Sequence, residues 1–493
     1  MIGQMEPLNA MEIGFVGIYL GFLLVIGFVG WRSRKANTLQ DFYLGGNSTG
    51  LWVLLLTLYA TQYSGNTLFG FTGKTYRIGF SWTVSVQFMT AIVVVYLTFA
   101  PRLFSLSRQH GFITPADYLQ HRFKTPALSL VGSIVMIIAI GNFLLAQMMA
   151  MGKAVEGLFE VNPWWAYVGG VVFLAVIIVV YETLGGFRAV AWTDAIQGSI
   201  LMFGFAALIV LIFQRFGSLE RATALLAEKD PGALQAPTAA GVREWISYLF
   251  IVGIGAALYP QAVQRIYCAR NAKTLRFSLM IMVFLPLVTT SVSLIAGIMG
   301  RAYLPDLTPE QTDSLLTIIC REVQQQSVVG RWVVVVLFAA ILAAIMSTAD
   351  SILLSISSMF TKDIYAPWIR RGAGESDLMR VGKLCAWLFI TGAAVGAILL
   401  KGTTLVTLLD RKLDLLIQLS PAFILGLWWK PLQGKAVLVG LVVGIGVALA
   451  LAFMGHGKLY GIHAGVYGLG MNVTLAVAIS WVSNPSAGGN APK

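Results

Sequence analysis

The sequence predicts an all-α integral membrane protein with about thirteen transmembrane helices. Of its 493 residues, 57% are hydrophobic and only 11% are charged, whereas a soluble protein carries about a quarter charged residues. Apolar runs long enough to cross a bilayer recur along the whole chain. This composition argues against a soluble enzyme and against a nucleic-acid-binding protein. The net charge of +12 is explained by basic residues in cytoplasmic loops.

The first apolar run, 11–31, is expected to be a retained span. Glu6 lies before this run, Glu12 lies at its start, and the basic segment RSRK follows it. A cleavable signal peptide has the opposite order, with the basic residues before the apolar run. The other spans are expected at 49–72, 78–100, 127–155, 161–181, 190–214, 245–267, 275–300, 329–361, 377–400, 412–429, 435–455 and 459–482. The small, polar tail 484–493 is expected to be disordered.

An odd number of spans places the two termini on opposite sides of the membrane. More than half of the 34 Lys and Arg residues, Arg265 among them, fall in the loops that would be cytoplasmic if the N-terminus were outside. Positive charge gathers in cytoplasmic loops. The expected topology is therefore N-terminus out and C-terminus in.

Two spans carry residues that interrupt helices. The second span contains QYSGNT at 62–67, and the seventh contains Gly253, Gly255 and Pro260. Transporters with inverted repeats bind their solute at interrupted helices that occupy corresponding positions in the two repeats. When the spans after the first are numbered one to ten, the interrupted helices are the first and the sixth. The pattern therefore predicts a five-plus-five inverted-repeat core over 49–429 within a single transmembrane domain, 1–483, with one extra helix before the core (11–31) and two after it (435–482).

Hydroxyl side chains share one face of the span at 329–361. Ala344, Ser347, Thr348 and Ser351 are spaced i, i+3, i+4 and i+7, and Asp350 flanks them on the helix. Sodium prefers oxygen ligands such as hydroxyls, carbonyls and carboxylates. Ser and Thr in membrane helices also bond back to their own helix as packing residues, but a carboxylate in hydrocarbon marks a functional site by default.

A second carboxylate stands in YETLGGFRAVAWTDAIQG, as Asp194. An exposed acid at a helix start is one interpretation, because acids favour helix N-termini. A buried functional carboxylate is the other, and spacing alone favours neither.

Three segments together closely resemble the sodium:solute symporter family, which includes bacterial proline, pantothenate, galactose and sialic acid symporters. They are LGGFRAVAWTDAIQG, FITPADYLQHRF and AAIMSTADS, in the family's order, and the resemblance covers nearly the whole chain. It implies an amino-acid/sodium symporter-like fold and sodium-driven uptake by alternating access.

The resemblance also implies site residues. The principal sodium site would use the carbonyls of Ala60, Tyr63 and Ala344 and the hydroxyls of Ser347 and Thr348. Some members hold a second sodium near an aspartate matching Asp194, with Ser347, Asp350 and Ser351 as partners. Asp350 replaces a serine of those members, which leaves open whether a second sodium, a proton or neither binds there.

By position, the residues that line the solute site would be Ser64, Asn66, Thr67 and Gln87, with Gln147 a weaker candidate. Gln62 stands where the proline symporter has an aspartate, so equivalence to that carrier is not expected. A neutral amide and hydroxyl lining suits a small organic anion or zwitterion, such as an organic acid, an amino acid or a vitamin.

The function expected from these observations is a sodium-coupled secondary active symporter of the inner (plasma) membrane. It would import a small polar solute, with Na+ as the coupling ion and the lipid bilayer as its surroundings, and would have no enzyme activity. Two alternatives remain open. One is proton coupling through Asp350 or Asp194, and the other is a sensor or channel built on a transporter fold.

Overall fold

The structure is a computed structural model. It describes residues 9–33, 36, 38–64, 66–156, 162–312, 314–324, 328–401 and 405–483. Within these ranges the chain is helical apart from connecting turns and one two-stranded hairpin, in which Lys458 pairs with His463 and Leu459 with Ile462. The expected all-α architecture is confirmed. The tail 484–493 lies outside the described residues.

The elements follow one another along the chain with short connections. They are α1 (Ala10–Arg32), α2 (Leu39–Leu44), α3 (Leu51–Gln62), η1 (Asn66–Gly70), α4 (Phe71–Ile78), η2 (Gly79–Thr83), α5 (Val84–His110), α6 (Pro115–Phe123), α7 (Pro126–Glu156), α8 (Pro163–Gly185), α9 (Phe187–Phe216), α10 (Leu219–Lys229), η3 (Pro231–Leu234), α11 (Ala239–Ala257), α12 (Pro260–Cys268), α13 (Ala272–Met282), α14 (Leu285–Tyr303), α15 (Pro309–Thr312), α16 (Leu315–Gln324), α17 (Val328–Met359), η4 (Phe360–Ile369), α18 (Glu375–Leu399), α19 (Leu405–Leu416), η5 (Ile417–Leu419), η6 (Pro421–Leu425), α20 (Gly426–Trp428), α21 (Gly434–Phe453), β1 (Lys458–Leu459), β2 (Ile462–His463) and α22 (Ala464–Val482).

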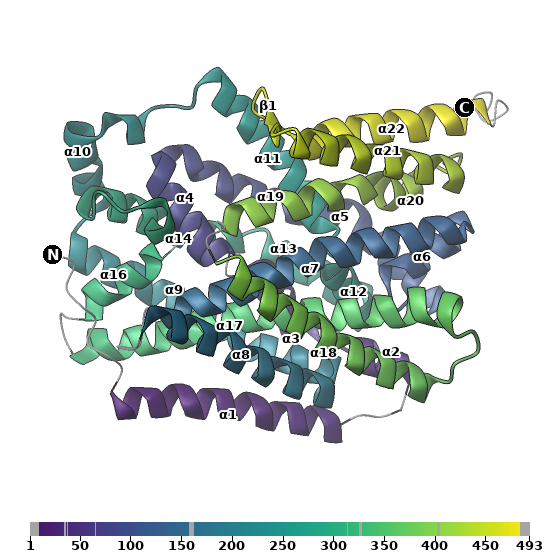
Figure 1. The fold of residues 1–493 in the computed structure, drawn as a ribbon, viewed down its shortest axis with the longest axis horizontal. Coiled ribbons are helices and arrows are strands. Elements are labelled where there is room, and N and C mark those ends of the chain that lie inside the picture. Colours follow the sequence, from purple (N-terminus) through teal and green to yellow (C-terminus); the bar gives the residue numbers. More distant parts are fainter. Residues whose placement is uncertain are drawn as a thin grey trace.

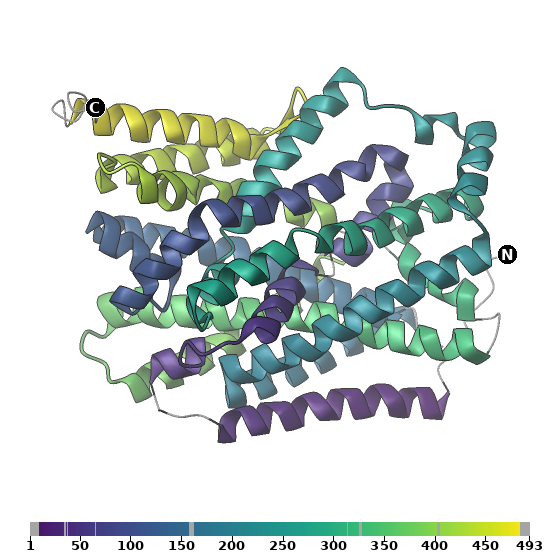
Figure 2. The ribbon, with the colours of Figure 1, turned by 180° about the vertical axis from the view of Figure 1, so that it is seen from behind.

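The long helices form a bundle whose axes run in roughly the same direction (Figure 1). Helix α1 lies along one edge, and α21 and α22 lie together along the opposite edge, as the reverse view also shows (Figure 2). Helix α17 crosses the middle of the bundle and packs against α7 and α9. Helix α1 begins at one end of the bundle and α22 ends at the other (Figure 1).

Eleven helical segments of the described chain are long and apolar enough to cross a membrane, two fewer than the thirteen predicted spans. The difference lies in two predicted spans that the structure divides. The span predicted at 49–72 is split into α3, η1 and α4, and the span predicted at 412–429 is split into the end of α19, η5, η6 and α20. Interrupted segments are shorter than the length that a straight membrane helix requires.

The predicted interruption of the seventh span is present. Helix α11 ends at Ala257 and α12 starts at Pro260, with the extended residue Tyr259 (φ −54°, ψ 124°) between them. A proline has no N–H and disfavours helical backbone in the residue before it. The break follows from Pro260 and isolates a short helix, α12, deep in the protein.

The turn between α8 and α9 depends on one glycine of the motif LGGFR. Gly186 has φ 59° and ψ −151°, a backbone conformation that only glycine adopts readily. A Cβ at this position would lie 2.7 Å from the Phe42 carbonyl oxygen. The tight turn lets α9 start directly after α8 and pack against α3 and α17, which places Asp194 between these helices.

Candidate cation and solute site

The site is built on the break after α3. Tyr63, the first residue beyond the helix, has an extended backbone (φ −97°, ψ 105°). In a continuous helix the amides of Ser64 and Thr67 would bond to the carbonyls of Ala60 and Tyr63. Instead, the Ser64 amide turns to Thr67 Oγ1 at 3.5 Å, and the Thr67 amide donates to the Ser64 carbonyl at 2.9 Å. The carbonyls of Ala60 and Tyr63 therefore lack the amide partners that a continuous helix would give them.

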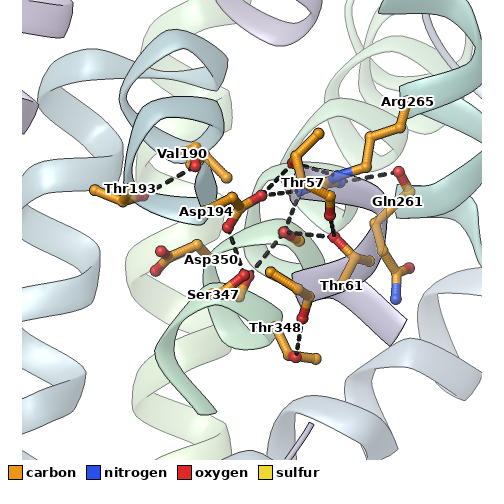
Figure 3. Close-up of polar contacts among 12 residues, drawn as sticks. Thr57, Thr61, Val190, Thr193, Asp194, Gln261, Arg265, Ser347, Thr348 and Asp350 are labelled. Carbon is orange, nitrogen blue, oxygen red and sulfur yellow. Dashed lines mark hydrogen bonds and ion pairs between the residues drawn. The ribbon is translucent and has the colours of Figure 1, made fainter. Parts of the chain in front are cut away.

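Helix α17 brings a hydroxyl to the Ala60 carbonyl. Thr348 Oγ1 lies 3.3 Å from the Ala60 carbonyl oxygen and 3.0 Å from the Ala344 carbonyl oxygen. Ser347, one residue earlier, donates its hydroxyl to Asp194. The structure thus brings Ala60, Ala344 and Thr348 together. Ser347 lies next to Thr348 on α17 and faces Asp194 of α9 (Figure 3).

Asp194 is a buried carboxylate and not a helix-start acid. It is fully buried in α9, whose first residue is Phe187. Its oxygens accept hydrogen bonds from Thr57 on α3 and Ser347 on α17, and Arg265 Nη2 on α12 forms an ion pair with Asp194 Oδ2 at 2.8 Å. Four helices therefore meet at this one carboxylate (Figure 3).

Sequence reasoning missed Arg265. The sequence predicts Arg265 in a cytoplasmic segment, but its side chain is only 2% exposed. The guanidinium donates from Nε to Thr57 Oγ1 at 2.8 Å and from Nη1 to the Gln261 carbonyl at 3.0 Å, and Nη2 also donates to Ser351. Arg265 could have been predicted from the rule that charged residues inside a membrane pair with one another, because a buried Asp194 requires a basic partner.

Asp350 and Ser351 face different neighbours. Asp350 is fully buried; the Tyr181 hydroxyl on α8 donates to its Oδ2, while its Oδ1 has no hydrogen-bond partner among the described residues. Ser351 accepts from Arg265 and donates to the Ser347 carbonyl at 2.8 Å. Ser351 therefore joins the Asp194–Arg265 cluster, whereas Asp350 is bonded toward α8.

The residues predicted to line the solute site are only partly brought together. Ser64, Thr67 and Gln147 are buried, and both η1 and α7 lie beside the break. Gln87 differs from the prediction because it is exposed on α5. The side chain of Asn66 lies outside the described part of the chain.

Gln62, the residue that departs from the proline symporter, holds the broken helix to its neighbours. Its Nε2 donates to the Tyr96 hydroxyl at 2.7 Å, and that hydroxyl lies 3.4 Å from the Ala256 carbonyl, at the end of α11. A neutral amide therefore links the two interrupted segments through Tyr96.

These features define a class of protein. Two helices interrupted inside a multi-span membrane bundle, with freed carbonyls, hydroxyls and a charged pair gathered at one break, are typical of secondary transporters. Irregular backbone is tolerated at membrane depth only where protein or a cavity satisfies it.

The chain belongs to the sodium:solute symporter family, whose sequence profile matches residues 42–444. It is thus a member of a family of transporters and not of enzymes, and a multi-pass membrane protein. The chain is 26% identical to the sodium/pantothenate symporter of Haemophilus influenzae, over 90% of this chain and 91% of the relative. It is also 26% identical to the osmoregulated proline transporter OpuE of Bacillus subtilis, over 96% and 95%.

The fold is similar to that of a Na+-coupled sialic acid symporter solved in a substrate-bound, outward-open state. The TM-score is 0.79 at 19% sequence identity, covering 96% of this chain and 98% of the solved one. This likeness supports the fold and carries no statement about the solute.

Proposed function

We propose that this protein is a sodium-coupled symporter that imports a small polar solute, with one sodium ion held between the broken end of α3 and the hydroxyl face of α17. The single observation that carries the proposal is the carbonyl of Ala60, released from its helix and placed 3.3 Å from Thr348 Oγ1. A freed carbonyl next to a hydroxyl of a second helix is the kind of oxygen pair that a hard cation binds.

The full ligand set would be the carbonyls of Ala60, Tyr63 and Ala344 with the hydroxyls of Ser347 and Thr348. Both hydroxyls donate their hydrogens, to Asp194 and to the Ala60 or Ala344 carbonyl. A hydroxyl that donates its hydrogen keeps lone pairs free for a cation. The ion would thus join two helices that otherwise meet through a few hydrogen bonds.

A second cation is expected near Asp194, Asp350 and Ser351, but a protein side chain already bonds to two of these residues. The guanidinium of Arg265 already bonds to Asp194 and Ser351 and is itself buried. We therefore propose that Arg265 supplies the positive charge at this position and that a single sodium ion is coupled to the solute.

The finer architecture belongs to the same proposal. A five-plus-five inverted repeat in a single transmembrane domain, with the N-terminus outside and the C-terminus inside, would place α3 and α11–α12 as the corresponding broken helices. Sodium would favour the outward-facing state, because a ligand shifts a conformational equilibrium only through its different affinity for the two states. Solute and sodium would then be released together on the cytoplasmic side by alternating access.

Proton coupling is the second candidate, favoured by Asp350 Oδ1, a buried carboxylate oxygen without a hydrogen-bond partner in the described chain. Uptake into proteoliposomes separates the two. Radiolabelled pantothenate, proline and lactate are offered under an inward sodium gradient, under an inward proton gradient without sodium, and with neither. Accumulation under the sodium gradient alone supports the proposal. Accumulation driven by the proton gradient without sodium contradicts it and favours Asp350 as a proton carrier.

A further inference from the structure

Lys412 is a buried lysine whose charge nothing in the described chain neutralises. Its side chain is 1% exposed, and its Nζ has no hydrogen-bond partner among the described residues. A lysine at this depth is rare unless it is paired, and an intramembrane charge marks a functional site by default.

Aromatic rings surround the ammonium group. Its Nζ lies over the Phe143 ring of α7, 2.8 Å from the centroid, and 5.0 Å from the centroid of the Tyr259 ring. These two rings stack on each other at 5.3 Å with an interplanar angle of 28°. Aromatic faces attract a cation, but this attraction is smaller than the cost of removing the cation from water.

The acidic neighbours of Lys412 on α19 have other partners. Asp410 lies near the Tyr248 hydroxyl (3.5 Å) and Lys458 (3.7 Å), and Asp414 accepts from the Gly465 amide at 2.7 Å. Residues two apart in a helix point to different sides. The carboxylates therefore face α11 and α22, and Lys412 faces α7.

The position of Lys412 connects it with the transport path. Helix α19 packs against α7, α11 and the short segment η1 that follows the break in α3. Tyr259 is the residue at the break between α11 and α12. Phe143 and Gln147, four residues apart, share one face of α7. The lysine therefore lies where both interrupted helices come together.

A second polar side chain at the α12 break also lacks partners. Both polar atoms of the Gln261 side chain, Oε1 and Nε2, are buried without a hydrogen bond in the described chain, and Gln261 is 0% exposed. Its amide lies away from the Asp194 cluster (Figure 3). Buried polar groups are usually satisfied by protein or ordered water, so this amide is available to a ligand.

We propose that Lys412 is the counter-ion for the carboxylate of the transported solute and that the solute is a small organic anion. This inference rests on the proposed symport function and narrows its solute class. The aromatic pair of Phe143 and Tyr259 would pack against the apolar part of the anion, and Gln261 would offer a hydrogen bond. A zwitterion fits less well, because Gln62 is neutral, Asp194 is already paired with Arg265, and Asp350 is bonded toward Tyr181 on α8.

The test measures thermal unfolding of the purified, full-length protein in detergent at constant sodium, with methanesulfonate as the background anion. The probes are matched by size: lactate with lactamide and pantothenate with panthenol, with proline as the zwitterion and chloride as an inorganic anion. We expect at least one carboxylate to raise the melting temperature and its neutral partner to have no effect.

Three variants locate the effect. Lys412→Met should melt no lower than the wild type when no solute is present, because it removes an unpaired buried charge, and it should bind the carboxylate at least tenfold more weakly. Lys412→Arg should keep the preference for the carboxylate. Lys435→Met, at an exposed lysine of α21, is the matched control and should bind as the wild type does.

Four results would overturn the proposal. They are equal stabilisation by a carboxylate and its neutral partner, stabilisation by chloride equal to that by the carboxylates, carboxylate binding unchanged in Lys412→Met, and no stabilisation by any carboxylate of the panel. Stabilisation by sodium alone is recorded in parallel. If sodium stabilises the wild type but the carboxylate preference is absent, only the anion site fails. If sodium has no effect, the proposed symport function fails.

Discussion

Removing either member of the Asp194–Arg265 pair should strongly destabilise the protein. The two side chains are 0% and 2% exposed and their charged atoms are 2.8 Å apart. Two unit charges about 4 Å apart, measured between the centres of the groups, attract by about 4 kcal/mol at the effective dielectric constant of a protein. Breaking such a buried pair typically costs about 3–5 kcal/mol, because the remaining charge is left without compensation.

A double-mutant cycle measures this interaction. Asp194→Asn and Arg265→Met should each lower the free energy of unfolding by about 3–5 kcal/mol, and the double variant should lose much less than the sum. The assay is denaturant-induced unfolding of the purified protein in detergent. The control is Arg370→Met, which removes an ion pair to Asp377 between side chains that are 61% and 40% exposed and should cost at most about 1 kcal/mol.

The same variants test the number of coupled cations. In Arg265→Met the oxygens of Asp194, Thr57 and Ser351 lose their cationic partner, so a second sodium gains a site and the sodium dependence of stabilisation should become steeper. Additive costs, within about 0.5 kcal/mol, would refute the reasoning about the pair. An unchanged sodium dependence in Arg265→Met would refute the claim that the guanidinium takes the place of a cation.

Two further predictions concern single contacts. The double variant Ser347→Ala/Thr348→Ala should need at least about tenfold more sodium for half-maximal thermal stabilisation, because it removes two oxygen ligands. The control is Thr90→Ala, which should leave this sodium concentration unchanged because the Thr90 hydroxyl donates to the Val86 carbonyl of its own helix. An equal sodium requirement in both variants would contradict the site. Tyr181→Phe should lower the free energy of unfolding by about 1–3 kcal/mol, because it leaves the buried carboxylate of Asp350 without its donor. The control is Tyr460→Phe, at an exposed tyrosine. Equal stability of the two variants would contradict the role of the Tyr181–Asp350 hydrogen bond.

Much of the fold follows from local signals. The membrane class follows from composition and from the length of the apolar runs, and both interruptions follow from residues that disfavour a helix at that place. The segment QYSGNT contains the end of α3, and Pro260 begins α12. Such signals act within a few residues, so a single sequence carries them.

The partners of the charged groups could not be predicted in the same way. Arg265 follows a break near the end of a predicted span, where a basic residue indicates a cytoplasmic interface. The structure buries it because α12 is a short helix that continues into the protein. Lys412 stands at the first position of the span predicted at 412–429, and its position in the chain does not show that it packs against Phe143 and Tyr259. In both cases the decisive contact joins segments far apart in the sequence.

The exposure of Gln87 could not be predicted from the sequence either. In a helix that is apolar on most sides, hydrophobic periodicity distinguishes the buried face from the lipid-facing one only weakly. Gln87 is predicted to line the solute site only from its position in the family's sequence. The face of α5 that is buried is decided by the packing of α5 against α11 and α14. The hydroxyl face of α17 could be predicted because its polar residues mark one side of the helix.

The most direct test of the central claim is equilibrium binding of radiolabelled sodium to the purified protein. We predict saturable binding of one ion per chain in the wild type and loss of this binding in Ser347→Ala/Thr348→Ala. Two ions per chain in the wild type, no saturable binding, or binding that survives in the double variant would contradict the account.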